Sequence, residues 1–263
     1  MPSIACPAGL DAEKLREAVL DTYTRVALQP RGEFHFNRGP AYAAAQLGYD
    51  PEELASLPEL CTEPFAGVGN PLAIAALEPG ETVVEVGSGA GMDLLLAARR
   101  IGPRGRAVGV DMTDAMIARC RRAAREAGLE NVEIRQGYAD ALPVPDGTAD
   151  VVISNGVLNL VPDKGAAFRE LFRVLRPGGR LQIADIAVES PLADDVRGNF
   201  EVWAACIGGA LAIGDFLEAL SGAGFEGVRV VDGFDPFLGS SKERTARLHG
   251  VRGVNVFGSR PAL

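Results

Sequence analysis

Three glycines and two acidic residues between Thr82 and Asp111 have the types and spacing that a ligand-binding site requires. Residues 82–91 read TVVEVGSGAG, so a short apolar run leads directly into Gly87, Ser88, Gly89 and Gly91. Glycine has no Cβ, so a turn of this composition lets a ligand approach the backbone closely. Asp111 ends the next apolar run, where a carboxylate can accept hydrogen bonds from both hydroxyls of a ribose. These features predict a site for a nucleoside-containing cofactor.

The absence of two phosphate-binding motifs narrows the class of cofactor. The dinucleotide fingerprint G-x-G-x-x-G needs glycine where Met92 stands, and no G-x-x-x-x-G-K-[ST] phosphate loop occurs in the sequence. Glu85, at the end of the predicted strand, would repel a pyrophosphate. A cofactor with an amino group and a sulfonium, and no phosphate, fits better. A nucleotide-dependent dehydrogenase is therefore disfavoured.

Alternating strands and helices must position these residues. From Thr82 onward the pattern is typical of an α/β fold with a doubly wound, mostly parallel sheet, which we expect to have seven strands within residues 71–263. Residues 1–70 are expected to form a helical and loop extension. Its first helix carries an apolar stripe of Leu15, Val19, Tyr23 and Val26. This helix either packs as a static cap or acts as a lid that brings Tyr23 to the reacting group.

Composition limits the partners and the compartment. The chain has 26 basic and 35 acidic residues, a net charge of −9, which disfavours nucleic acid because its binding depends on cation–phosphate contacts. No stretch is long and apolar enough for a membrane span, and the first residues lack the pattern of a secretory signal. Four dispersed cysteines without a C-x-x-C pair favour a reduced, cytoplasmic protein. We expect a small-molecule substrate and no metal ion, and the sequence leaves the oligomeric state undecided.

The glycine turn with Glu85 and Asp111 resembles that of the class I S-adenosylmethionine-dependent methyltransferases. The resemblance implies a Rossmann-like fold and S-adenosylmethionine as the cofactor. It places Met112 on the adenine face. It also assigns the loop after the third strand to adenine, through the backbone of Ala139 and the carboxylate of Asp140.

A narrower resemblance, over roughly residues 40 to 260, is to the arsenite methyltransferases. The segments LGYDPEELASLP, GVGNP, ISNGVLNLVPDK and CIGGAL carry it. In that family cysteine thiolates hold arsenic(III), a soft centre that prefers soft ligands. Here Val68 and Gly156 occupy two of the cysteine positions, and only Cys206 is retained.

This departure leaves several interpretations of the acceptor site. In the first, arsenic is held by Cys206 together with Cys61 and an external thiol. In the second, which we favour, the site binds a different small methyl acceptor. Cys206 could also be only a small buried apolar residue. Trp203 is expected on one helix face with Cys206, and Asn155 and Gly156 are expected beside the sulfonium. A cofactor-binding module without turnover is a further alternative.

A general base is needed only for some acceptors. Sulfur, selenium or arsenic(III) needs no strong base, whereas a hydroxyl or a carbon acid does. The candidate catalytic residues are Tyr23, His35 and Asp185. His35 lies between Phe34 and Phe36, so aromatic packing is the alternative interpretation of this residue.

Overall fold

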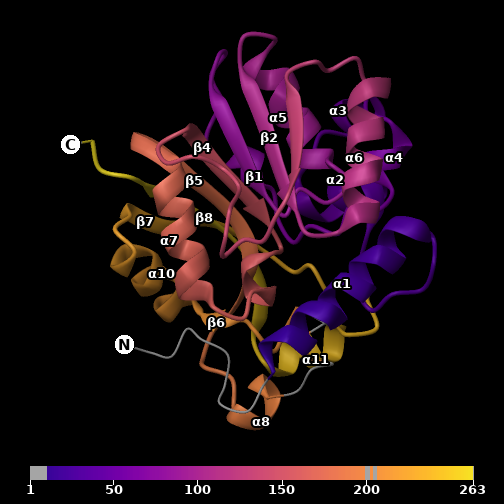
Figure 1. Cartoon of the computed structure of the whole chain (residues 1–263). Helices are drawn as coiled ribbons and strands as arrows, with labels where there is room; N and C mark the ends of the chain where they lie inside the picture. The colour runs from indigo at the N-terminus through magenta and orange to yellow at the C-terminus, as the bar shows by residue number, and fades with distance from the viewer. Residues whose placement is uncertain (1–10, 199–201, 204–205, 263) are drawn as a thin grey trace.

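A sheet of eight strands forms the centre of the molecule (Figure 1). The computed structural model describes residues 11–198, 202–203 and 206–262. The strands follow the order β3-β2-β1-β4-β5-β8-β7, and β6 pairs with β5 outside this path. Their bounds are β1 Thr82–Val86, β2 Arg106–Asp111, β3 Val132–Gln136, β4 Ala149–Asn155, β5 Leu175–Val188, β6 Leu211–Ala212, β7 Glu226–Phe234 and β8 Val251–Ser259.

The sheet is mostly parallel, as the sequence predicts. Strands β1 to β5 pair in parallel, and β8 runs antiparallel to both of its neighbours. The expected seven strands form the continuous path. The two-residue strand β6 is an addition that the sequence pattern did not predict.

Helices cover both faces of the sheet. Their bounds are α1 Ala12–Leu28, α2 Gly39–Leu47, α3 Pro51–Ala55, α4 Glu59–Thr62, α5 Met92–Ile101, α6 Asp114–Glu126, α7 Lys164–Val174, α8 Asp194–Arg197, α10 Ile213–Gly222 and α11 Glu243–Leu248. None of the helices in the described ranges has the length and apolar content that crossing a bilayer requires.

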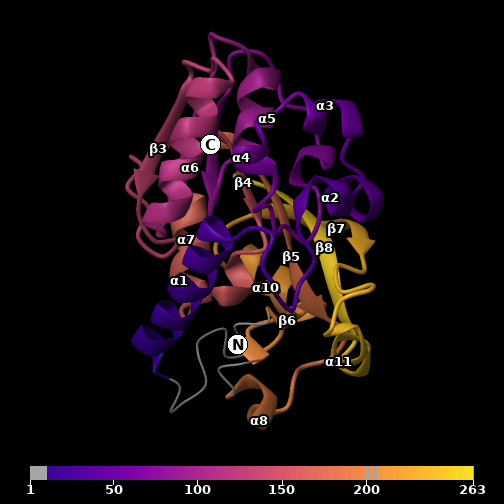
Figure 2. The same cartoon turned by 90° about the vertical axis from the view of Figure 1, so that its right-hand side faces the viewer.

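Strand β1 shows how the sheet separates two hydrophobic clusters. Side chains alternate across a strand, so Val84 and Val86 pack with α7 and α10 while Val83 packs with α5 and α6. Figure 2 shows α2, α3 and α4 beside α5 and α6, on the side of Val83. Glu85 shares the face of Val83, and it therefore lies on the side covered by the N-terminal extension.

The N-terminal extension is helical, and its first helix buries the predicted stripe. Leu15, Val19 and Val26 are buried, Tyr23 is half-buried, and α1 lies against α6 (Figure 1). Asp11 caps the helix by accepting hydrogen bonds from the N–H groups of residues 13 and 14. The extension therefore packs directly onto the helices that flank β1.

Candidate functional site

The carboxyl ends of strands β1, β2, β3 and β4 open into one cavity of about 1110 Å³, the solvent-filled mouth included. In open parallel sheets, ligands bind at this edge. The predicted cofactor residues that line it are Glu85, Gly87, Ser88, Gly89, Gly91, Asp111, Met112, Ala139, Asp140 and Asn155. The structure thus brings all ten together from four separate strand ends.

Two positions of the glycine turn accept no other residue without rearrangement. Gly87 has φ +72°, and a Cβ there would lie 2.2 Å from Val157 Cγ2. Gly91 has φ +97°, and a Cβ there would lie 2.4 Å from the Cys120 sulfur. The N–H groups of Gly87 and Ser88 both donate to the Val110 carbonyl, which draws the turn towards β2. The glycines therefore let the backbone itself form the floor of the cavity.

Glu85 is the most informative polar group in the cavity. The residue is 3% exposed, and within the described chain its Oε2 has no hydrogen-bond partner. The nearby Ser88 Oγ is likewise buried and unpaired among described residues. Burial, with Asp93 and Asp111 nearby, raises the pKa of Glu85 well above its ordinary value. A buried carboxylate with one oxygen left unpaired is costly, so this position favours a ligand that brings a cationic donor such as an amino group.

Asp111 stands at the end of β2, and about half of the hydrogen-bond acceptor sites of its carboxylate are occupied. Its two oxygens accept from the N–H groups of Gly89 and Thr113, each at 2.8 Å. Burial raises its pKa, and these backbone hydrogen bonds oppose that rise. A carboxylate has about four lone-pair sites, so Asp111 can still accept from ligand hydroxyls.

A buried polar network that sequence reasoning missed lies beneath the cavity. Asp93 accepts from the Tyr49 hydroxyl at 2.6 Å and from Asn155 Nδ2 at 2.9 Å. Asn155 also donates to the Gly69 carbonyl and accepts from the Val68 N–H. Asn155 therefore fixes the loop of residues 67–70, and its predicted place beside a sulfonium stays a prediction.

The adenine end of the predicted site contacts helix α1. The guanidinium of Arg16 forms an ion pair with Asp140 and lies 5.4 Å from the centre of the Tyr138 ring. No local pattern in the sequence pointed to Arg16, because the partners are 124 residues apart. This pair connects the N-terminal extension to the loop that follows β3.

A second, smaller cavity adjoins the first. It measures about 280 Å³ with open solvent included but has room inside for only about one water molecule, and it shares Tyr23, Ala66 and Gly67 with the larger one. Its walls include Val68 and Cys206, and the Tyr23 hydroxyl lies 3.9 Å from the Cys206 sulfur. Burial raises the pKa of Cys206 to about 12, so the thiol is protonated near neutral pH.

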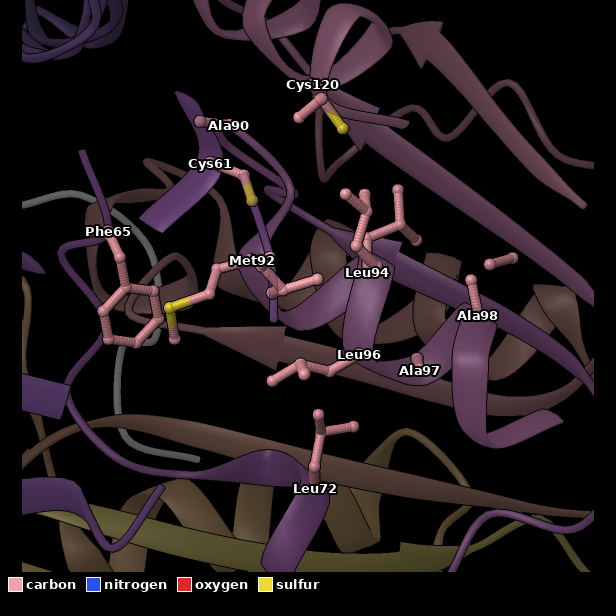
Figure 3. Close-up of a cluster of buried hydrophobic side chains, with 14 of the residues drawn as sticks. Cys61, Phe65, Leu72, Ala90, Met92, Leu94, Leu96, Ala97, Ala98 and Cys120 are labelled. Atoms are coloured by element: carbon pink, nitrogen blue, oxygen red, sulfur yellow. The ribbon is translucent and has the colours of Figure 1, made fainter. Parts of the chain in front are cut away.

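The substrate candidates therefore fall in two places. Cys61 lines the larger cavity, donates to the Pro58 carbonyl, and packs in the cluster of Met92 and Cys120 (Figure 3). Burial raises its pKa to about 12. Gly156 also lines the larger cavity. Cys61 and Cys206 thus belong to different cavities and different hydrophobic clusters.

The predicted single helix through Trp203 and Cys206 is wrong at Cys206. Trp203 is helical and buried, but Cys206 lies in a turn with φ +61°, where its N–H donates to the Trp203 carbonyl. Residues 204 and 205 lie outside the described chain. The two side chains nevertheless pack in one hydrophobic cluster.

The remaining candidate bases lie outside both cavities. His35 is half-buried, and its ring lies edge-on to Phe36 at 4.9 Å between centres. Asp185 is 1% exposed and accepts from the N–H of Leu158 and from Asn159 Nδ2. Neither is among the described residues that line the two cavities. Within the described ranges, no group of three or more His, Cys, Asp or Glu residues is arranged to hold a metal ion.

Comparison with known proteins gives consistent similarities. Residues 77–234 match a family model described as a methyltransferase domain. The chain is 39% identical over 236 residues to an arsenite methyltransferase of Halobacterium salinarum, covering 85% of this chain and 60% of that protein. It is 38% identical over 168 residues to an arsenite methyltransferase of Aquipseudomonas alcaligenes, covering 61% of this chain and 49% of that protein. The chain thus spans about half to three fifths of these two relatives.

A solved structure agrees with the sequence similarity. The chain superposes with a TM-score of 0.65 on an arsenic(III) S-adenosylmethionine methyltransferase from Chlamydomonas reinhardtii. The identity is 30%, and the match covers 86% of this chain and 74% of that one.

Proposed function

Because the chain belongs to the methyltransferase domain family, with S-adenosylmethionine as its cofactor, we propose that it methylates a small molecule other than arsenite. The observation that carries this proposal is the pair of adjoining cavities. On the wall of the larger cavity stands Glu85, whose Oε2 has no hydrogen-bond partner among the described residues. The described lining of the smaller cavity contains one thiol, that of Cys206.

The chain's residues supply binding and placement. When bound, S-adenosylmethionine supplies a methyl group on a positively charged sulfur. Glu85 would accept from the amino group of the cofactor and Asp111 from its ribose hydroxyls, and Met112, Ala139 and Asp140 would hold its adenine. Holding the reactants in line and excluding water accounts for most of the rate enhancement in such a reaction. The gap between the cavities, at Tyr23 and Gly67, is where the two reactants would meet.

Arsenite methylation is the second candidate, because the similar proteins carry that name and Cys206 is retained. Three features argue against it. Val68 and Gly156 supply no thiolate, Cys61 opens to the other cavity, and burial keeps Cys206 protonated near neutral pH. A three-thiolate arsenic site would therefore need ligands from outside the chain.

The test is formation of S-adenosylhomocysteine and methylated arsenic from S-adenosylmethionine, arsenite and a thiol reductant. We expect cofactor binding without arsenic-dependent turnover. Turnover that is lost in Cys206→Ser would instead establish the arsenite function. If the chain binds the cofactor but no acceptor class yields S-adenosylhomocysteine, it is a cofactor-binding module without turnover.

The compartment and the partners complete the proposal. The net charge of −9 supports a small-molecule substrate and not nucleic acid. Cys61, Cys120 and Cys206 are free thiols in the described chain, which supports a reducing, cytoplasmic location. Fractionation of cells that express the full chain tests the location.

A further inference from the structure

We propose that Asp185 and Lys164 are positioning residues for methyl transfer. Together they fix the part of the larger cavity's wall that follows β4, so that it lies against the reacting methyl group of the bound cofactor. Neither is among the described residues that line the two cavities, so both act through the short turn between them. This inference rests on the proposed methyltransferase function and adds two residues behind the wall of its site.

The loop after β4 forms an apolar part of that wall. Five of its residues line the larger cavity: Gly156, Val157, Leu160, Val161 and Pro162. Leu160 packs in one hydrophobic cluster with Val19 of α1. The groups predicted to hold the amino, ribose and adenine parts of the cofactor come from β1, β2 and the loop after β3. The loop after β4 therefore borders the space left for the methyl group and its acceptor.

The centre of this loop is a single 3-10 turn, η2, which spans Leu158–Leu160. Two internal hydrogen bonds close it, donated by the N–H groups of Leu160 and Val161. A turn this short leaves the N–H groups at its start and the carbonyls at its end without partners inside the turn. Its position therefore depends on groups from other segments of the chain.

Asp185, on β5, binds the start of the turn. Its carboxylate accepts from the N–H groups of Leu158 at 2.7 Å and Asn159 at 3.3 Å, and from Asn159 Nδ2 at 2.6 Å. It also accepts from the N–H of Ile186 at 2.7 Å, which fills the roughly four acceptor sites of a carboxylate. The carboxylate is therefore fixed in place and has no lone pair left for a proton of the substrate.

Lys164, the first residue of α7, binds the end of the same turn. Its ammonium donates to the carbonyls of Asn159 at 3.1 Å and Val161 at 3.0 Å. The residue is 3% exposed, and its Nζ lies 4.4 Å from the centre of the Trp203 ring. A negative charge at the start of a helical turn and a positive charge at its end both match the direction of the backbone dipoles. Asn159 thus joins the two charged groups.

Stability alone does not explain why two charged side chains are buried at this turn. Removing a charge from water is costly, and buried ionic groups can often be replaced by apolar side chains without loss of stability. Hydrogen bonds from fixed charges instead define one geometry of the turn. This matters for a transfer reaction, because a displacement of about 1 Å can reduce the rate about 100-fold. We therefore assign the two residues to the geometry of the wall.

The experiment observes the methyl group itself. S-adenosylmethionine labelled with ¹³C in its sulfonium methyl is bound to the full chain, and the NMR signal of that methyl is recorded. The variants are Asp185→Asn and Lys164→Met. Glu85 and Asp111 are intact in both, so we expect their affinity for S-adenosylhomocysteine, by calorimetry, to stay within about threefold of the unaltered chain. We expect the bound methyl signal to move towards that of the free cofactor in both.

A control and a double variant separate positioning from a general effect on the fold. Asp150 accepts from the Thr82 N–H at 2.7 Å and pairs with Arg176, at the amino end of β4 and outside the lining of both cavities. Asp150→Asn should therefore leave the methyl signal unchanged. The double variant of Asp185→Asn and Lys164→Met should move the signal no further than one single change, because both residues act on one turn.

The outcomes distinguish this inference from the proposed function. Unchanged methyl signals in both single variants, with normal cofactor affinity, would overturn the inference and leave the methyltransferase function in place. Loss of cofactor binding in both would also overturn it, because the residues would then maintain the fold as a whole. A double variant that shows the sum of the single shifts would mean that the residues do not act through one turn. An unaltered chain that binds no S-adenosylmethionine would overturn both the inference and the function. If one single variant does not fold, the other decides.

Discussion

Val68 and Gly156 face each other at the boundary between the two cavities. A Cβ on Gly156 would lie 3.5 Å from Val68 Cγ1 and 3.6 Å from Cγ2. Val68 also shares the smaller cavity with Cys206. The structure thus gathers the three positions at which the arsenite methyltransferase resemblance expects thiolates, although only one of them carries sulfur.

This arrangement predicts that arsenic binding can be rebuilt. Val68→Cys combined with Gly156→Cys would place two thiols close to Cys206, and soft thiolates bind arsenic(III). We expect the double variant to bind one arsenite per chain, measured by equilibrium dialysis under reducing conditions, while the unaltered chain binds at least tenfold more weakly. The φ of +73° at Gly156 will cost the variant about 1 kcal/mol of stability.

The control for the rebuilt site is the pair Val68→Ala and Gly156→Ala, which imposes the same backbone strain without sulfur. Arsenite binding that is equal in the two double variants would show that the positions do not converge on one ligand. Adding Cys206→Ser to the cysteine variant should remove the gain.

Glu85 predicts a charge-dependent cofactor affinity. Glu85→Gln keeps the shape of the side chain but removes the negative charge that faces the cofactor amino group. A hydrogen bond to a charged group is worth about 1.5–3 kcal/mol, so we expect affinity for S-adenosylhomocysteine to fall about 10–100-fold by calorimetry. Glu133→Gln, on edge strand β3 and outside the cavity lining, is the control. Affinities of the two variants within twofold of each other would contradict this assignment.

Asp93 predicts a change of stability with pH. Burial raises its pKa from 3.8 to about 6, although hydrogen bonds from Tyr49 and Asn155 oppose the shift. Between about pH 4 and pH 6 the unfolded chain releases this proton while the folded chain still holds it. Stability is therefore lost as pH rises through this window, by about 3 kcal/mol from this one group.

The measurement is urea unfolding of the unaltered chain and Asp93→Asn at pH 4, 5, 6 and 7. The variant cannot ionise, so we expect its stability relative to the unaltered chain to improve by about 3 kcal/mol between pH 4 and pH 7. A constant difference between the two proteins would show that Asp93 keeps an ordinary pKa in the folded state.

Arg16 predicts how the N-terminal helix affects the cofactor. If α1 is a lid, its pair with Asp140 must open before the cofactor leaves. The Arg16 side chain is 41% exposed, and a pair of this kind is worth about 0.2–1 kcal/mol. We therefore expect Arg16→Met to speed release of S-adenosylhomocysteine up to about fivefold in stopped-flow measurements. Arg122→Met, which loses only a pair with Glu126 within α6, serves as the control; equal release rates would favour a static cap.

Much of the fold was predictable because local patterns determine it. Short valine-rich runs, apolar on both faces, identified β1, β2 and β4, and the three glycines located the turn that forms the cavity floor. Asp111 was found because its spacing from that turn is a local feature. In these parts of the structure, the residue types within each short segment were enough to identify it.

The rest depends on contacts that no local pattern contains. The network of Tyr49, Asp93 and Asn155 joins three segments, and each residue looks ordinary in its own surroundings. Helical spacing between Trp203 and Cys206 misled the prediction, because a positive φ at a non-glycine residue has no sequence signature. Asp185 looked like a free base, but its carboxylate accepts hydrogen bonds from the loop after β4.

The two cavities share Tyr23, Ala66 and Gly67, but the rest of their walls come largely from different stretches of the chain. Glu85, Asp111 and Asp140 belong to the first half of the sheet, whereas the smaller cavity is built from residues 23–68 and 206–237. Mutations that reshape the second set need not disturb the first. Acceptor preference can therefore drift during evolution while cofactor use stays constant. Enzymes descended from one ancestral gene can in this way differ in substrate while they use the same methyl donor.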